Sequence, residues 1–109
     1  MTTLKDWIEK CANGEEIEGV VLGEMGWGDY GSEEVKDYEK CPKGTVMTWS
    51  EVIPWISYEF DDGYGAHGCQ AITAWTKNRV IGVSQYDGST SPFWMPRNPI
   101  DHTPNMPGG

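Results

Sequence analysis

The last third of the chain holds the pattern that most restricts the fold: two strand-like runs separated by a two-residue turn. Gln70 to Thr76 and Arg79 to Tyr86 are rich in apolar and β-branched side chains, and only Lys77-Asn78 lies between them. A connection this short joins antiparallel neighbours, because a parallel crossover needs a dozen or more residues. Asp87-Gly88 then marks a second hairpin, and Pro92 to Met95 returns as a short edge strand. The sequence therefore predicts a three-strand antiparallel meander.

The N-terminal segment has helical rather than strand periodicity. Leu4, Trp7, Ile8 and Cys11 follow the spacing of one helix face. Thr3 is placed to cap the helix with Asp6 three residues later, and Asn13-Gly14 ends it. The β-branched run from residue 17 to residue 22 predicts a further strand. Together these elements predict an α+β fold, in which an N-terminal helix packs on an antiparallel sheet with a C-terminal three-strand meander.

The middle of the chain is less regular. Residues 23–32 contain four glycines and are expected to form no regular element. Ser32 is placed to cap a short, highly charged helix over residues 33–40, whose acids come first and whose lysines come last.

Two alternatives remain open for residues 45–49. They form a short strand, or Thr48 and Glu51 form a capping box that opens one helical turn. Pro54 should end such a turn early, because its ring clashes with the preceding turn and it lacks an N–H. The alternation over residues 55–60 then predicts a strand.

Length and proline content predict the domain organisation. At 109 residues and 12.2 kDa the chain has room for one domain, which we assign to residues 1–96. Four prolines lie in or just before residues 97–109, which we expect to form an extended or disordered tail. The tryptophans in periodic segments are expected in the core: Trp7, Trp49, Trp55, Trp75 and Trp94.

Several features favour a cytoplasmic protein. No apolar run is long enough to span a membrane, and the first residues lack the apolar stretch of a signal peptide. The three cysteines, Cys11, Cys41 and Cys69, are odd in number and widely spaced, which is typical of reduced thiols.

The net charge of −9 argues against direct binding of nucleic acid or of an anionic membrane. The acidity is uneven, because residues 1–62 hold 15 acidic and five basic side chains, a net charge of −10. Carboxylates interleaved with aromatics can compete for a site built to take phosphates, since Lys and Arg bind both groups alike. The simpler alternative is that the negative charge serves only to keep the protein in solution. The candidate partner-binding residues are Glu15, Glu16, Glu18, Glu24, Trp27, Asp29, Tyr30, Glu33, Glu34, Asp37, Asp61 and Asp62.

Two other classes of function remain as alternatives. The first is an oligomeric sponge that sequesters a nucleotide signal, in which aromatic side chains stack on the base and cations hold the phosphates. Its candidate residues are Trp27, Tyr30, Tyr64, Lys77, Arg79 and Arg97. The second is a small Cys/His enzyme that uses Cys69 and His67, although no third residue is indicated to orient the imidazole. Neither metal-ligand spacing nor a cofactor motif is present, so we expect no metal and no cofactor.

Short motifs resemble a known group of proteins. Trp55-Ile56-Ser57, Tyr86-Asp87-Gly88 and Phe93-Trp94-Met95-Pro96 are similar to motifs of an uncharacterised prophage family, whose members carry an early Trp-Ile-Ser and end near Trp-Met-Pro. The long acidic segment before Trp55 departs from that family. The resemblance implies a bacteriophage context, and with it the cytoplasm of a host bacterium, but no activity.

The favoured hypothesis joins charge and context. The sequence predicts a non-enzymatic, phage-encoded inhibitor that acts as a nucleic-acid mimic, docking an acidic surface onto a basic, nucleic-acid-binding host protein involved in defence. A homo-oligomer is a further possibility that the sequence leaves open.

Overall fold

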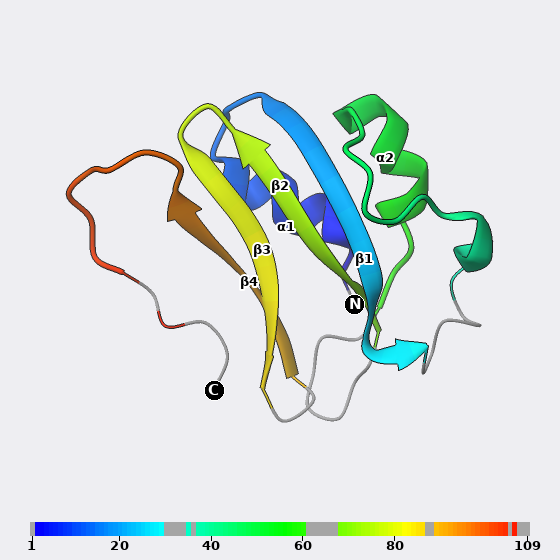
Figure 1. The fold of residues 1–109 in the computed structure, drawn as a ribbon. Coiled ribbons are helices and arrows are strands. Elements are labelled where there is room, and N and C mark those ends of the chain that lie inside the picture. The colour runs from blue at the N-terminus through cyan, green and yellow to red at the C-terminus, as the bar shows by residue number, and fades with distance from the viewer. Residues whose placement is uncertain are drawn as a thin grey trace.

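A four-stranded antiparallel sheet is the centre of the described structure, a computed structural model (Figure 1). It describes residues 2–29, 35, 37–60, 68–86, 89–104 and 106, with the backbone alone at 26–29 and 86. The sheet has the order β1-β2-β3-β4. The elements in chain order are α1 (Leu4–Ala12), β1 (Ile17–Asp29), η2 (Tyr38–Lys40), α2 (Trp49–Ile56), β2 (Gln70–Thr76), β3 (Arg79–Tyr86) and β4 (Ser89–Pro96).

The predicted N-terminal helix is confirmed, with both of its caps. The Thr3 side chain accepts a hydrogen bond from the Asp6 N–H, and Asn13 ends α1 in the left-handed conformation with φ of 52°. Leu4 and Ile8 are completely buried. They lie one turn apart, so the apolar stripe of the helix faces the sheet.

Helix α2 resolves the alternatives at residues 45–49 and corrects the strand predicted at 55–60. Thr48 and Glu51 form a reciprocal capping box, and α2 continues through Pro54 to Ile56. Pro54 comes late enough that only the last residues of the helix follow it, so little of the hydrogen-bond ladder is lost. Val52 and Ile56, one turn apart, are fully buried. Burial of this pair favours helix over the alternating strand pattern.

Strand β1 is longer than predicted, because it continues from Leu22 to Asp29 through the glycine-rich segment. Gly23 fits where it does because a Cβ there would lie 3.2 Å from the Cβ of Ala71 on β2. The prediction that residues 23–32 lack a regular element is therefore wrong for 23–29. Register shifts between Ile17 and Gly19 and between Leu22 and Met25 insert one extra residue each into β1.

The predicted helix over residues 33–40 is also wrong. Asp37 has φ of 57°, in the left-handed region, and only Tyr38–Lys40 form a short 3-10 turn. A left-handed residue interrupts the helical hydrogen-bond ladder, so a continuous helix through Asp37 is excluded. Residues 33, 34 and 36 lie outside the described part.

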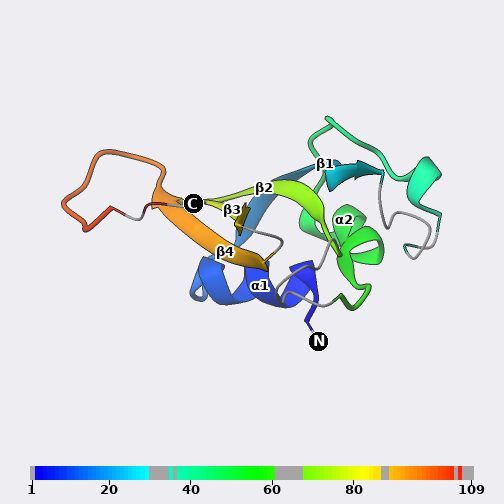
Figure 2. The ribbon, with the colours of Figure 1, turned by 90° about the horizontal axis from the view of Figure 1, so that it is seen from below.

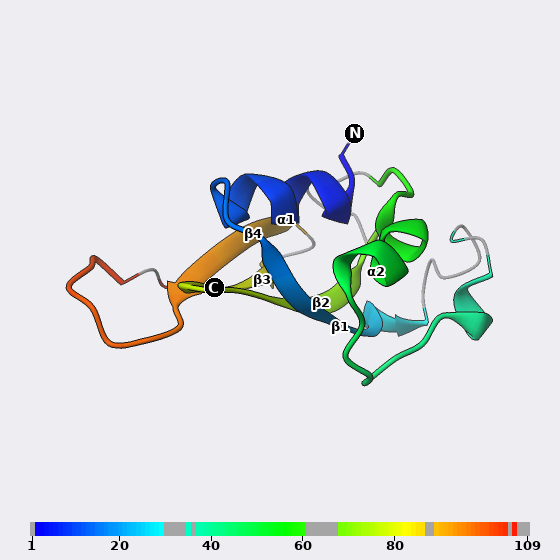
Figure 3. The same ribbon diagram turned by 90° about the horizontal axis from the view of Figure 1, so that it is seen from above.

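Helices cover one face of the sheet (Figures 2 and 3). α1 contacts β3 and β4, and α2 contacts β1. The central buried row runs Val20–Ala74–Ile81–Trp94 across the four strands, and the first three of these residues have no exposed surface. The meander β2-β3-β4 and its Lys77-Asn78 turn confirm the sequence prediction.

The two edges of the sheet are closed in different ways. At the β1 edge, Val20 and Met47 exchange two backbone hydrogen bonds of 2.9 and 2.8 Å. At the β4 edge, Pro92 and Pro96 lie four residues apart, so their backbone nitrogens point to the same side of the strand. Proline donates no N–H, and its place in a sheet is an edge whose N–H side faces solvent. The outer edge of β4 is therefore poorly suited to pairing with another strand.

Candidate functional site

The carboxylates of β1 are set by its two bulges. Glu18 lies in the first register shift and Glu24 in the second. A bulge turns its extra residue out of the regular alternation and re-aims the side chain. Glu18 pairs with Arg97, beyond the end of β4, and Glu24 accepts a 2.7 Å hydrogen bond from the Tyr38 hydroxyl. Each bulge thus directs one carboxylate towards a distant segment of the chain.

Glu15 fastens the start of β1 to the β2–β3 turn. Its carboxylate accepts hydrogen bonds from the Thr76 hydroxyl at 2.6 Å and from the side-chain and backbone nitrogens of Asn78 at 2.7 and 3.2 Å. These bonds stabilise the charged form, and the pKa of Glu15 is lowered, mainly by the bond from Thr76. The neighbouring Glu16 is exposed.

The predicted acidic set is divided between the two ends of β1. Glu15, Glu16 and Glu18 lie at its start, whereas Glu24 lies near Tyr38 and the exposed Asp37. Glu15 and Glu24 are nine residues apart, but each of the two bulges adds a residue without adding length, so the separation along the strand is about 23 Å. The described carboxylates therefore follow one long edge of the sheet in two groups and do not form a single cluster.

The remaining predicted residues lie outside the described part. Neither a position nor a contact is assigned to the side chains of the following residues: Trp27, Asp29, Tyr30, Glu33, Glu34, Asp61, Asp62, Tyr64 and His67. Their roles as partner-binding, ligand-binding or catalytic residues remain predictions.

Three of the described cations bind backbone carbonyls of the chain itself. Arg79 donates a 2.7 Å hydrogen bond to Cys11 O near the end of α1, and its guanidinium lies 3.7 Å from the centre of the Trp94 ring. Arg97 donates to Thr76 O at 3.0 Å in addition to its pairing with Glu18.

The third is Lys43, which donates to Tyr38 O and Cys41 O and lies 4.1 Å from the Tyr38 ring centre. Two of the three phosphate ligands suggested for a nucleotide sponge, Arg79 and Arg97, thus already hold parts of the fold. Lys77 is exposed.

The face of the sheet opposite the helices carries apolar side chains that the sequence analysis did not single out. Two complete rows cross the four strands, and we call them together the outer face. They are Gly19–Trp75–Val80–Met95 and Val21–Thr73–Gly82–Phe93. Thr73 has the only polar side chain in these rows, and none of their residues is ionisable.

Trp75 corrects a prediction, because it was expected in the core with the other tryptophans. The pattern of burial along β2 alternates, and Trp75 is half-buried on the outer face while its neighbour Ala74 is fully buried. The other four tryptophans of that prediction pack against the core. The signal that could have found this difference is the period-2 alternation of β2, which separates Trp75 from Ile72 and Ala74.

Two glycines shape the outer face beside aromatic rings. Gly19 pairs with Trp75, and a Cβ at Gly19 would lie 3.2 Å from a methyl group of Val46. Gly82 pairs with Phe93, and a Cβ there would lie 3.2 Å from the tip of that ring. A missing side chain lets the ring of the cross-strand neighbour lie over the backbone.

A groove of about 310 Å³ opens at the β1 end of the first row. It is lined by Glu18, Gly19, Val46, Trp75 and Arg97. Val46 is 67% exposed, and the Glu18–Arg97 pair closes one side. The groove is thus mainly apolar and its two charges neutralise each other.

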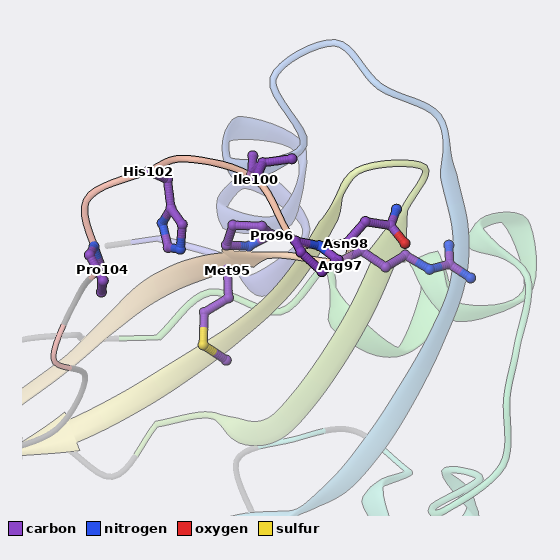
Figure 4. Close-up of a pocket in the computed structure, with 8 residues that line it drawn as sticks. Met95, Pro96, Arg97, Asn98, Ile100, His102 and Pro104 are labelled. Atoms are coloured by element: carbon purple, nitrogen blue, oxygen red, sulfur yellow. The ribbon is translucent and has the colours of Figure 1, made fainter.

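A second groove, of about 430 Å³, lies between the end of β4 and the segment that follows it. Figure 4 shows that Met95 and Ile100 point to opposite sides here, while Arg97 extends across the sheet towards β1. This segment has no helix or strand among its described residues 97–104 and 106. The division into a domain of residues 1–96 and an extended or disordered tail of residues 97–109 stays a prediction.

The described thiols have the properties of packed side chains. Burial raises the pKa of Cys69 to about 12, and burial also raises the pKa of Cys11. A nucleophilic cysteine requires the opposite shift, because the thiolate is the reactive form. Within the part of the chain that the structure describes, no group of three or more His, Cys, Asp or Glu side chains is placed to hold a metal ion.

Comparisons with known proteins give no family to which the chain can be assigned. No protein-family model matches it, and neither a curated protein nor a solved structure does. Among the described helices, none has the length and apolar character needed to cross a bilayer.

Proposed function

We propose that this protein is a non-enzymatic binding protein whose acidic β1 edge docks onto the basic, nucleic-acid-binding surface of a host protein and inhibits it. In this proposal the protein is a bacteriophage inhibitor of host defence that acts in the bacterial cytoplasm. Carboxylates along the edge take the place of phosphates, since both bind Lys and Arg through charge-assisted hydrogen bonds.

The observation that carries the proposal is the different use of the two charge signs. Arg79, Arg97 and Lys43 hold backbone carbonyls of their own chain. Glu16 and Asp37, by contrast, are exposed at the two ends of β1. Hydrogen bonds to neutral groups, as at Glu15 and Glu24, fix the position of a carboxylate without cancelling its charge. These three cations therefore support the fold, while Glu16 and Asp37 leave a negative charge exposed along the edge.

The spacing of the two acidic groups suggests the kind of partner. Carboxylates about 23 Å apart along one strand fit an extended basic groove better than a small pocket. A long groove that tracks a phosphate backbone has such a shape. The raised pKa values of Cys69 and Cys11 favour this binding role over a thiol enzyme.

The test is capture from a bacterial lysate on immobilised protein, followed by elution with duplex DNA or with salt. Partners that use a nucleic-acid site should leave the column when duplex DNA is added. They should also leave as salt rises from about 0.05 M to about 0.5 M, because screening shortens the reach of exposed charges. Captured proteins that resist both treatments would contradict the proposal.

A pair of matched variants separates the edge from the overall charge. Glu16→Gln with Asp37→Asn removes two exposed charges from the β1 edge. Asp6→Asn with Asp101→Asn removes two exposed charges elsewhere. The first pair should reduce capture of DNA-eluted partners several-fold and the second should leave it nearly unchanged. Equal losses would show that net charge alone is responsible.

A further inference from the structure

The outer face is an apolar surface in a chain of high negative charge. Its two rows contain no ionisable residue, although the protein carries a net charge of −9. Val46 belongs to the segment that pairs with β1 through Met47, where it lies opposite Val21, and its side chain leans over Gly19. Val46 thus covers the β1 end of the first row, Gly19–Trp75–Val80–Met95.

The two ends of this row have complementary shapes. At one end is the groove beside Gly19, Val46 and Trp75. At the other end is Met95, whose side chain is 44% exposed and flexible enough to fill an irregular gap. Three strand spacings separate Gly19 from Met95, a distance of about 14 Å. A two-fold interface brings identical surfaces together, so each surface must be complementary to itself. The Met95 side chain and the groove, at opposite ends of one row, meet this requirement.

We propose that two copies of this chain pair through their outer faces, about a two-fold axis that is parallel to the strands and passes between Trp75 and Val80. This symmetry reverses the row in the second copy, so Met95 of each copy enters the groove beside Val46 and Gly19 of the other. Face-to-face packing of two sheets with strands nearly aligned is a common arrangement, with the sheets about 10 Å apart.

Charge favours a second copy over a charged partner on this face. Both outer faces are uncharged, and the Glu18–Arg97 pair at the groove is neutral overall. Pairing them therefore buries no unpaired charge and leaves Glu16 and Asp37 outside the contacting rows. Pairing through the β4 edge is a poorer alternative, because Pro92 and Pro96 remove donors from that edge.

The area predicts a weak, concentration-dependent dimer. The two rows are four strands wide and about four residues long, a face of about 19 by 13 Å, or about 250 Å² per copy. The total of about 500 Å² is smaller than a stable specific interface, so pairing is expected only at high protein concentration. This inference is independent of the proposed inhibitor function, since the β1 edge and the outer face are separate surfaces and each has its own experiment.

The first test measures mass as a function of concentration by analytical ultracentrifugation of the full chain. The wild-type protein should change from monomer to dimer over about a hundredfold rise in concentration. Met95→Asp should weaken pairing by about tenfold or more, because it would bury a carboxylate without a partner. Met95→Leu should retain pairing. A monomer throughout the range would overturn the proposal.

Lys10→Gln is the matched control for charge. It shifts the net charge by −1, as Met95→Asp does, but at an exposed position of α1 on the other side of the sheet. Its dimerisation should remain close to that of the wild type. A loss as large as that of Met95→Asp would show that general repulsion sets the association and would contradict pairing through this face.

The second test identifies the contact itself by treating a Val46→Cys, Met95→Cys double variant with a short bismaleimide cross-linker. A direct disulfide is not expected, because sheets packed about 10 Å apart hold facing Cα atoms beyond the limit of about 7 Å. Within one copy the two introduced thiols are about 19 Å apart, too far for a reagent that spans about 10 Å. In the predicted dimer the thiol at position 46 of one copy lies near the thiol at position 95 of the other, so a covalent dimer should form. Each single variant and the wild type should give much less. A dimer in ultracentrifugation without this cross-link would overturn the proposed symmetry.

Discussion

The two faces of the sheet have similar composition and opposite surroundings. Ile81 and Val80 are neighbours on β3, but Ile81 is fully buried beneath the helices while Val80 is only half-buried on the outer face. The inner face is covered because α1 and α2 supply apolar stripes against it. The comparison shows that apolar character alone does not place a residue in the core. A residue of the sheet is buried only if its side chain lies on the face that the helices cover.

The largest expected difference comes from truncating these two neighbours. Ile81→Ala should lower the free energy of unfolding by about 2–5 kcal/mol, because it removes buried methylenes and leaves a cavity. Val80→Ala should cost about 1 kcal/mol or less, since its side chain keeps contact with water. Urea unfolding at low protein concentration, where association is negligible, measures both. Equal costs would mean that the outer face is covered within a single copy.

A second contrast concerns polar groups on the two faces. Gln70 is fully buried on the inner face, where its Oε1 accepts a 3.1 Å hydrogen bond from the Tyr58 hydroxyl and its Nε2 donates to Gly23 O. Tyr58→Phe should cost about 1–3 kcal/mol of unfolding free energy, because it leaves buried groups of Gln70 without that partner.

The control is Thr73→Val on the outer face, which should change the unfolding free energy by no more than about 0.5 kcal/mol. Both variants are compared by urea unfolding with the slope monitored. If Tyr58→Phe were as mild as Thr73→Val, the hydrogen bonds of Gln70 would contribute little to the fold.

The sequence predicts an element of this structure well where local contacts determine it, and poorly where contacts with distant residues do. The strands and the turn at Lys77-Asn78 follow from alternation and loop length, and the caps of α1 follow from Thr3 and Asn13. At Pro54 the local rule failed, because burial of Val52 and Ile56 outweighs the lost hydrogen bond. The glycines of β1 led to a wrong prediction of irregular structure for a similar reason. Ala71 of β2 lies so close to Gly23 that a residue without a side chain fits this position of the strand.

The candidate surfaces were harder to predict than the fold. The sequence identified the carboxylates of the β1 edge by composition, but their division into two groups depends on bulges that no local pattern indicates. The alternation along β2 places Trp75 and Ala74 on opposite faces of the sheet. Which of the two faces is buried depends on where α1 packs, and the alternation does not indicate that. Ion pairs within the chain, such as Arg97 with Glu18, join residues 79 positions apart, and the local sequence gives no signal for them.

An alkaline pH dependence follows from the burial of Cys69. Its thiol ionises near pH 9.0 when unfolded, but its pKa is raised to about 12 in the fold. Above pH 9 the unfolded chain therefore binds fewer protons, and unfolding becomes easier as pH rises through this window. The loss should be up to about 1.4 kcal/mol per pH unit. Full stability from this group is present below pH 9.

Unfolding by urea at pH 8, 9 and 10, with a reductant present, tests this dependence. Cys69→Ala removes the titrating thiol and should flatten the decline between pH 9 and pH 10, although its stability at pH 8 should already be lower. An unchanged slope in Cys69→Ala would show that other groups cause the decline. Tyr58 is one such group, because burial raises its pKa as well and its effect begins near pH 10.

The smallest expected effect lies at the acidic end of β1, where Glu15 and Glu16 are adjacent but differ in their contacts. Hydrogen bonds from Thr76 and Asn78 lower the pKa of Glu15 below its ordinary 4.5, so its charged form stabilises the fold. This contribution is present above pH 4.5 and is lost as pH falls through the lowered value. Glu15→Gln should therefore give a small drop in Tm at neutral pH and a weaker decline of Tm in acid.

Glu16→Gln is the control that separates these bonds from charge, because it removes the same charge from an exposed neighbour without the three hydrogen bonds of Glu15. In a protein of net charge −9, removal of one negative charge lowers general repulsion and should leave Tm equal or slightly higher. If both variants lowered Tm alike, the bonds to the β2–β3 turn would not be responsible. A fall in Glu15→Gln alone would assign this carboxylate to the fold and leave Glu16 as the edge residue available to a partner.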